Sequence, residues 1–329
     1  MEEKVVFVTG ATGYIGKRLC AELLAQGYRV KALCRQLPTT APMPNLEWVV
    51  GDLTNETDLK TLVAGCSQGF HLAAYAKVWA KDPATFFRIN VEGTTYLLEA
   101  ALQAGVKRVV LTSTAGVLGA SPDATTLCDE NQTPIFPLTT AYEKTKAIAE
   151  HKAKAFLQKG MDIITVNPTR VYGPGLLSDS NAVTKILKQY GAGKWKFMPG
   201  NGQSIGNYVF VEDVVQGLLL ALWHGKSGER YILGGENASY CTLFDTMGQV
   251  TGKTLKLYPM PLSVMMAVAK FQKLMADGFG WPPLITPGFV RKYNHHWNVS
   301  SQKAIEQLGY SITPLAKGLQ TTWQWLQSS

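Results

Sequence analysis

A glycine-rich segment near the start of the chain constrains the fold more than any other feature. A short apolar and β-branched run, Val5–Thr9, leads into Gly10, and Gly13 and Gly16 follow at the start of a helical pattern. Gly10 permits a tight turn, Gly13 lets the backbone approach a pyrophosphate, and Gly16 lets the helix pack closely on the strand. Because the N–H groups at such a helix start are free, this segment predicts a binding site for a dinucleotide.

Strand and helix patterns alternate through the first half of the chain. Parallel strands need a crossover connection, usually a helix, so the alternation predicts an α/β fold with a doubly wound parallel sheet, the Rossmann arrangement. We expect strands at residues 4–9, 28–34, 46–50, 70–73, 108–113 and 162–167, and long helices at 14–26, 86–104 and 141–158.

A smaller, interleaved C-terminal substrate domain is expected after this core. Beyond Pro168 the pattern loosens into loops rich in glycine and proline, short strands and separate helices. We expect residues 1–172 to form the dinucleotide-binding core, with 207–233 returning to it. Residues 173–206 and 234–329 then form the substrate-binding region.

Composition excludes several classes of protein. The chain has 329 residues, of which 46% are apolar and 17% charged, which excludes disorder as the main state. Its apolar stretches fall short of the roughly 18–20 residues that span a bilayer, and its start lacks the pattern of a secretion signal. The five cysteines are scattered without a CxxC pair. They indicate a reduced, cytoplasmic protein with no structural zinc site.

The net charge of the chain is +8, and the distribution of the basic residues indicates which kind of binding partner explains it. Lys and Arg residues are spread along the chain and form no stripe, so an anionic cofactor or a solvated surface explains the charge better than nucleic acid. A metal site is not expected either. The adjacent His295 and His296 point to different faces in regular structure, and no carboxylate lies at metal-ligand spacing.

The end of the second predicted strand selects between dinucleotides. Enzymes that prefer NAD usually carry an acidic residue there, which accepts hydrogen bonds from the ribose hydroxyls. This chain has Cys34 followed by Arg35. Because a guanidinium pairs with a 2′-phosphate, we predict NADP(H), the alternative being that Arg35 is a solvated loop residue.

A tyrosine and a lysine provide the candidate catalytic pair. Tyr142 and Lys146 are four residues apart on one predicted helix, hence on one face. The pKa of a free phenol is about 10. A neighbouring ammonium would lower this pKa, which suits proton transfer to or from a carbinol oxygen. Thr112, Ser113 and Thr114 lie at the carboxyl end of the fifth predicted strand, where such sheets bind ligands, and a hydroxyl there can hold the substrate oxygen. The alternative is a surface Tyr–Lys pair.

At this point the chain resembles the extended short-chain dehydrogenase/reductase superfamily over nearly its whole length. The matching motifs are residues 9–16, 52–53, 71–74, 90–94, 113–119, 142–146 and 167–175. The resemblance implies that Tyr142 is the general acid/base, that Lys146 binds the nicotinamide ribose, and that Thr114 holds the substrate oxygen. The cofactor-binding residues that it implies, together with those above, are Gly10, Thr12, Gly13, Tyr14, Ile15, Gly16, Arg35, Asp52, Leu53, Leu72, Ala73, Ala74, Tyr142, Lys146, Pro168 and Val171.

Departures from the family's motifs favour a ketone reductase. Dehydratases of this family have an Asp-Glu pair where this chain has Ala115 and Gly116, and sugar-nucleotide enzymes have an Arg-Asp pair where it has Gly206 and Asn207. Without that arginine a diphosphate loses its strongest expected partner. The chain instead resembles the dihydroflavonol-reductase and 3β-hydroxysteroid-dehydrogenase-like branch, which shares an insertion at about 255–297.

The insertion at about 255–297 and Arg170 each allow two interpretations. The apolar residues of the insertion lie at helical spacing, which fits either ordinary helix packing or an apolar lid over a bulky substrate. Arg170 is either a structural ion-pair partner or a substrate anchor. The helices at 86–104 and 141–158 resemble those of the family's four-helix dimer interface, so a homodimer is expected.

The main hypothesis is therefore an NADPH-dependent reductase, or reversible alcohol dehydrogenase. Its substrate would be a ketone or aldehyde of a bulky, mainly apolar small molecule. The alternatives are an NAD(P)-dependent sugar epimerase and a non-catalytic NADPH-binding module.

Overall fold

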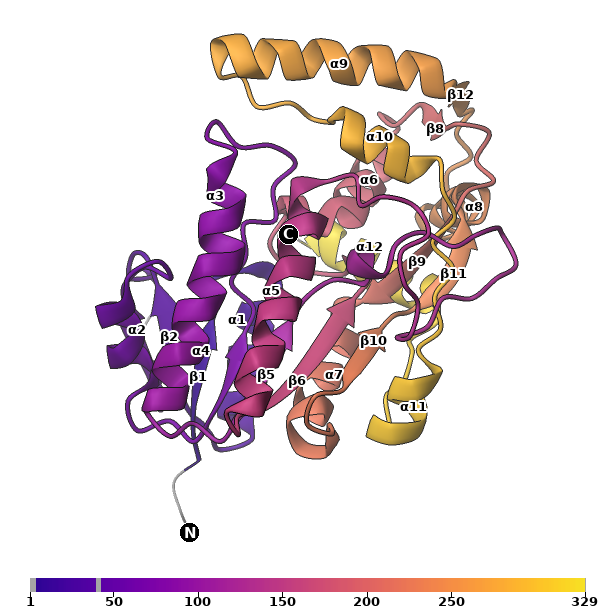
Figure 1. Ribbon diagram of the computed structural model, residues 1–329. Coiled ribbons are helices and arrows are strands. Elements are labelled where there is room, and N and C mark those ends of the chain that lie inside the picture. The colour runs from indigo at the N-terminus through magenta and orange to yellow at the C-terminus, as the bar shows by residue number, and fades with distance from the viewer. Residues whose placement is uncertain (1–3, 40–42, 329) are drawn as a thin grey trace.

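A seven-stranded parallel sheet forms the centre of the molecule (Figure 1). The structure is a computed structural model that describes residues 4–39 and 43–328. All neighbouring strands pair in parallel, in the order β10-β6-β5-β4-β1-β2-β3, which confirms the predicted doubly wound sheet. The strands are β1 (Val5–Thr9), β2 (Arg29–Cys34), β3 (Leu46–Val50), β4 (Gln68–His71), β5 (Arg108–Thr112), β6 (Asp162–Pro168) and β10 (Arg230–Leu233).

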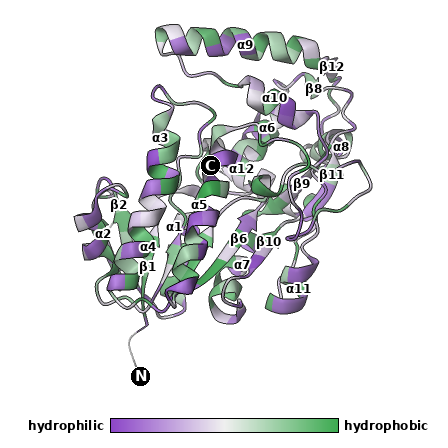
Figure 2. Ribbon diagram, viewed as in Figure 1, coloured by the Kyte–Doolittle hydropathy of each residue, from purple (hydrophilic) through white to green (hydrophobic). Residues whose placement is uncertain are grey.

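Helices cover both faces of this sheet, as the apolar strand sequences require. In β1, Val6 and Val8 point to one face, where they pack with residues of α1 (Tyr14–Ala25) and α7 (Val211–His224). Phe7 points to the other face, toward α2 (Glu56–Val63), α4 (Gly93–Gln103) and α5 (Ala141–Gln158). Figure 2 shows hydrophobic residues along the strands and mixed residues along the covering helices.

The predicted helix over residues 86–104 is three successive helical segments. α3 (Ala84–Phe87) is followed by a π-helical turn, Arg88–Glu92, and then by α4. π-Helical turns occur often at functional sites, and this one carries the side chain of Asn90 inward, where it is buried. Helical periodicity alone could not indicate the irregular turn.

The remaining elements surround a second apolar cluster beyond the carboxyl ends of the large sheet. The members of this cluster include Tyr172, Leu187, Tyr208, Phe244 and Leu319. The elements are the sheets β11 (Glu236–Ser239), β9 (Ile205–Phe210), β7 (Arg170–Tyr172) and β12 (Tyr258–Met260), β8 (Phe197–Pro199), with α6 (Ala182–Gly191), α8 (Tyr240–Thr251), α9 (Leu262–Phe279), α10 (Pro287–Tyr293) and α12 (Leu315–Ser328).

The segment 207–233 divides between the two parts. α7 and β10 join the large sheet, whereas β9 pairs with β7 and β11 in the small one. α11 (Gln302–Leu308), which falls in the expected substrate-binding region, packs on α7 and β10. In the part of the chain that the structure describes, no helix has the length and apolar character to cross a membrane.

Candidate active site

The glycine turn between β1 and α1 has the geometry of a phosphate cradle. Gly10 has φ of +72°, and a Cβ atom there would lie 2.7 Å from the backbone nitrogen of Ala73. A Cβ atom on Gly16 would lie 2.1 Å from the carbonyl oxygen of Gly10, so neither position accepts a side chain. No side chain caps the start of α1. Its first N–H groups are therefore available to an anionic ligand, and the cradle fits a dinucleotide.

The three candidate residues between these glycines differ in their surroundings. Thr12 is exposed and Ile15 is half-buried. Tyr14 is buried, and its hydroxyl donates a hydrogen bond to the carbonyl oxygen of Gly173 at 3.0 Å. The Tyr14 side chain thus ties α1 to the segment after β7, and any contact with a cofactor is left to its backbone.

A buried hydrogen-bond network holds the segment after β4 against this turn. The Thr9 hydroxyl lies 2.7 Å from His71 Nδ1, and His71 Nε2 lies 2.8 Å from the Thr94 hydroxyl. Burial lowers the pKa of His71 well below its usual value, and the nearby Lys146 lowers it further, so the imidazole is neutral. Thr9 also accepts the Ala73 N–H. This arrangement places Leu72, Ala73 and Ala74, all half-buried, beside Gly10.

The ends of β2 and β3 place a cation and a carboxylate at one edge. Arg35 is exposed directly after β2 and has no hydrogen-bond or ion-pair partner among the described residues. The pKa of Asp52 is lowered by hydrogen bonds from the Thr54 hydroxyl and N–H, and less strongly by the charge of Arg35. Leu53 is buried beside them. Arg35 is therefore free to meet an anion at this edge.

Thr114 stands at the carboxyl end of β5 with its hydroxyl hydrogen unused. Its Oγ1 accepts the Gly116 N–H at 3.1 Å, which leaves the hydroxyl proton to be donated elsewhere. The side-chain amide of Asn167 donates to the Thr114 carbonyl oxygen at 3.0 Å and to Glu150 at 2.9 Å. Asn167 therefore links β6, α5 and the residue that the sequence predicts to hold a substrate oxygen.

Tyr142 and Lys146 lie in the first turns of α5, which a capping box between Thr140 and Glu143 starts. Tyr142 is half-buried, whereas Lys146 is 1% exposed and has no hydrogen-bond or ion-pair partner among residues 4–39 and 43–328. Burial lowers the pKa of Lys146 to about 8, with the charge of Glu150 acting in the opposite direction.

The pKa of Tyr142 is shifted in the direction opposite to the one expected from the sequence. Burial raises the pKa of Tyr142 above its usual value, and the charge of Glu143 raises it further. The expected lowering by Lys146 is absent here, because desolvation penalises the phenolate more than any cation stabilises it. The phenol is thus a proton donor throughout the neutral range.

Asn90 was not singled out as a site residue from the sequence, although it lies in one of the family motifs. Its amide oxygen accepts the Tyr75 N–H at 2.7 Å, and its amide nitrogen donates to the Thr145 hydroxyl at 3.0 Å. Thr145 lies between Tyr142 and Lys146 in α5. Asn90 therefore positions the catalytic helix relative to the segment after β4, and the π-helical turn that carries it has no periodic signal.

Among the described residues, Arg170 is bound by tyrosines and not by a carboxylate, so it is not the ion-pair partner that was one of its two alternatives. Its Nη1 donates to the hydroxyls of Tyr240 at 2.9 Å and Tyr208 at 3.4 Å, and the guanidinium lies 5.5 and 5.6 Å from the two ring centroids. In the described part of the chain Arg170 forms no ion pair. It stands two residues after the buried Pro168 and directly before Val171, the candidate residues beside the nicotinamide.

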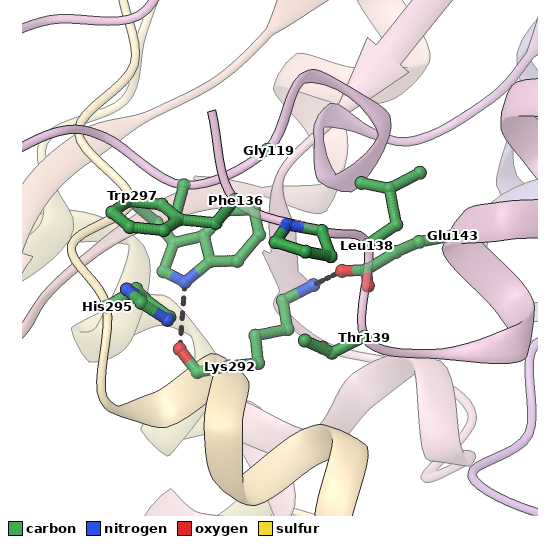
Figure 3. A pocket seen from close by; sticks show the side chains of 10 residues that line it. Gly119, Phe136, Leu138, Thr139, Glu143, Lys292, His295 and Trp297 are labelled. Carbon is green, nitrogen blue, oxygen red and sulfur yellow. Dashed lines mark hydrogen bonds and ion pairs between the residues drawn. The ribbon is translucent and has the colours of Figure 1, made fainter. Parts of the chain in front are cut away.

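A partly buried ion pair joins the catalytic helix to the C-terminal insertion (Figure 3). Lys292 of α10 lies 2.6 Å from Glu143 Oε1, and its ammonium also lies 4.4 Å from the centre of the Trp297 ring. The Trp297 indole N–H donates to the Lys292 carbonyl oxygen at 2.9 Å. Gly119, Phe136, Leu138 and His295 are among the other residues that line this small cavity. No group of three or more potential metal ligands occurs among the described residues.

The sheet and the cradle at its carboxyl edge define a Rossmann-fold protein of the dinucleotide-binding class. A sequence model of the NAD dependent epimerase/dehydratase family matches residues 6–234. The chain belongs to this family, as its motifs predict. A nicotinamide dinucleotide is accordingly its cofactor class, and its relatives include reductases and dehydrogenases.

Two curated relatives match almost the whole chain. A Synechocystis sp. protein with the provisional name dihydroflavonol 4-reductase is 33% identical and covers 98% of this chain and 94% of its own length. Sterol demethylase protein B of Methylococcus capsulatus is 31% identical, with 92% of each chain covered. Among solved structures, gox2253 has a TM-score of 0.80 at 30% identity, covering 99% and 98% of the two chains. These relatives confirm the predicted branch and fold.

Proposed function

We propose that the protein is an NADP(H)-dependent oxidoreductase that reduces a ketone or aldehyde, or oxidises the corresponding alcohol. The proposal rests mainly on two ionisable side chains of helix α5. This helix holds a protonated phenol at Tyr142, and four residues later an ammonium that is almost completely buried without a partner. A buried cation without a partner is costly, and the hydroxyls of a bound ribose would supply the missing acceptors.

Each candidate catalytic residue has one task in this reaction. A nicotinamide held by the cradle would supply the hydride in reduction or accept it in oxidation. Thr114 donates a hydrogen bond to the substrate oxygen with the hydroxyl proton that Gly116 leaves unused. Tyr142 donates its phenolic proton to the same oxygen in reduction and takes it back in oxidation. Lys146 would bind the hydroxyls of the nicotinamide ribose with its buried ammonium.

Replacing the phenol tests this assignment. In Tyr142→Phe the general acid is lost while the ring remains, so turnover should fall by about 10²–10⁴-fold. The measurement is NADPH oxidation against a panel of flavonoid, steroid, aliphatic and sugar-nucleotide carbonyls. NADPH binding, followed by fluorescence, should be retained, which separates lost chemistry from lost folding. Near-full turnover of the variant would refute the proposal.

We propose NADP(H) rather than NAD(H) because of Arg35. Its side chain is exposed and has no partner among the residues that the structure describes, at the edge where the adenosine ribose binds in Rossmann folds. A 2′-phosphate gives the guanidinium a bidentate partner. In Arg35→Ala the ratio of kcat/KM for NADPH to that for NADH should fall about tenfold or more. Arg29→Ala, at the opposite end of β2, serves as the control, and an unchanged ratio in Arg35→Ala would contradict the assignment.

A bulky, mainly apolar substrate is favoured by the relatives and by the absence of a diphosphate anchor. Besides the two full-length relatives, a 3-beta-hydroxysteroid dehydrogenase of Mycolicibacterium neoaurum is 32% identical over 67% of this chain. Gly206, which has no side chain, occupies the position of the expected arginine, and Asn207 occupies that of the aspartate. The buried amide of Asn207 is engaged by Thr169 at 2.7 Å and by the backbone of Gly235 at 2.8 Å. Neither residue therefore offers an anchor to a diphosphate, which disfavours the epimerase alternative.

We further propose a homodimer formed through α4 and α5, and a cytoplasmic location. The dimer follows from the resemblance of these helices to the family's interface. The location follows from the cysteines, because all five are free and four of them are buried.

A further inference from the structure

Helix α9 presents an apolar face that the described remainder of the chain leaves exposed. The helix lies at one end of the molecule and packs on α10, where Met265 and Ala269 meet Val290 (Figure 1). Its exposed face consists of apolar side chains that are 42–68% exposed: Val264, Val268, Phe271 and Leu274.

The exposed face is regular rather than incidental. Val264, Val268 and Phe271 follow one another at spacings of four and three, which places them on one side of a helix. Lys270 and Lys273 lie on the neighbouring side, between the apolar face and the packed one, where Lys273 forms an ion pair with Asp277 and Lys270 is exposed. After the helix the chain exposes further large apolar groups, Phe279, Trp281 and Leu284.

Two further aromatic side chains are exposed at the same end. Phe197 in β8 and Tyr258 in β12 are register partners in the two-stranded sheet, and each is 52% exposed. Figure 1 shows β8, β12, α6, α9 and α10 gathered at this end of the molecule. We call residues 182–206 and 253–297 the basic apolar end. These 70 residues hold nine of the twenty large, strongly exposed apolar side chains in the described part of the chain.

The basic apolar end also carries the net charge of the whole protein. It contains ten Lys and Arg residues and a single acidic residue, Asp277, hence a net charge of +9, whereas the full chain has +8. The remaining 259 residues are therefore close to neutral. The basic residues are spread along the chain, as noted from the sequence. What distinguishes these two segments is that acidic residues are almost missing from them.

We propose that the basic apolar end docks on the surface of a bilayer that contains anionic lipids. An amphipathic helix with lysines beside its apolar face and exposed Trp and Phe residues at its end has the features of a helix that lies in a membrane interface. The apolar side chains would enter the boundary of the acyl chains, and the lysines would meet lipid phosphates.

Other occupants fit the charge less well. A second copy would bring two surfaces of net charge +9 face to face, which like-charge repulsion disfavours. Nucleic acid would neutralise the charge but leave the apolar stripe without a partner. The bilayer surface accounts for both properties, and the proposal does not depend on the proposed reaction.

Vesicle flotation of the full chain tests the proposal. At low salt we expect at least tenfold more protein on vesicles of phosphatidylcholine with about 30% phosphatidylglycerol than on phosphatidylcholine alone. Raising the salt to about 0.5 M should remove most of this difference, because it screens the lysines. Equal binding to both vesicles, or no binding to the anionic ones, would overturn the proposal.

Double variants test whether the apolar face of α9 is responsible for vesicle binding. Phe271→Glu with Leu274→Glu should abolish flotation, and Lys270→Gln with Lys273→Gln should weaken it severalfold without placing a charge in the apolar stripe. The matched control, Leu127→Glu with Ile305→Glu, replaces two exposed aliphatic residues outside the basic apolar end and should bind as the wild type does. Retained NADPH binding shows that each variant is folded.

Each remaining outcome rejects the bilayer as partner. Undiminished flotation of both variants would mean that the face is not the docking surface. If Phe271→Glu with Leu274→Glu instead splits a wild-type oligomer in size-exclusion chromatography without vesicles, the face belongs to a second copy.

Discussion

At the scale of the residue, Lys146 shows how strongly its surroundings determine its chemistry. The side chain is 1% exposed, and burial lowers the pKa of its ammonium to about 8 although Glu150 lies near enough to oppose the shift. The same desolvation raises the pKa of Tyr142. The two groups are therefore displaced in opposite directions, and the phenol stays protonated while the amine titrates.

This difference predicts the pH dependence of cofactor capture. The kcat/KM for NADPH reports groups of the free enzyme, so it should fall above pH about 8, approaching tenfold per pH unit as Lys146 loses its proton. The raised pKa of Tyr142 keeps the phenol out of this range. Initial rates between about pH 6 and 10 provide the measurement.

The variant Lys146→Arg tests whether Lys146 is the group that causes the decline in kcat/KM. A guanidinium keeps its charge to far higher pH, so the variant should lose activity overall but show no decline beginning near pH 8. A variant profile that declines at the same pH as the wild type would assign the titration to another group.

At the scale of the element, α5 connects the catalytic residues to distant parts of the chain. Asn90 bonds to it from the π-helical turn, Asn167 from β6, and Lys292 from α10. Because Glu143 directly follows Tyr142, its ion pair with Lys292 ties the C-terminal insertion to the start of the catalytic helix.

Removing one side of this pair should destabilise the protein. Lys292→Met leaves the buried Glu143 carboxylate with only its capping-box partners, so the free energy of unfolding should fall by about 2–4 kcal/mol. Urea denaturation measures the loss. Combining the change with Glu143→Gln should recover part of it, because no unpaired charge then remains; an additive double variant would show that the two residues are not coupled.

At the scale of the whole molecule, the fold separates two surfaces with different properties. The cofactor edge and the helices α4 and α5 belong to the large sheet, whereas the net charge and exposed apolar groups gather at the basic apolar end. Assembly and docking would therefore use different faces.

The dimer prediction can be tested on the outer face of α5. Light scattering should give twice the 36.0 kDa of one chain. Ile148 is exposed on α5, and Ile148→Glu would place a charge in a helix–helix interface, so its mass should shift toward one chain. Leu127→Glu is the matched control. A monomeric wild type would refute the interface.

Much of the core followed from local patterns. The strand at Leu46–Val50 and the helix at Ala141–Gln158 have the predicted bounds, and the other predicted strands differ by at most two residues at either end. By contrast, the π-helical turn at Arg88–Glu92 interrupts a helix predicted as continuous. Its position depends on where the Asn90 amide finds partners, and those partners are distant in sequence.

By itself the sequence determined the alternation of strands and helices, the glycine turn and the spacing of Tyr142 and Lys146, because these depend on near neighbours along the chain. Only the tertiary structure decided which distant residues meet. It brought Lys292 to Glu143, surrounded Arg170 with tyrosines instead of a carboxylate, and buried Lys146 without a partner. The physical reason is that pairing and desolvation depend on packing between segments far apart, about which local periodicity carries no information.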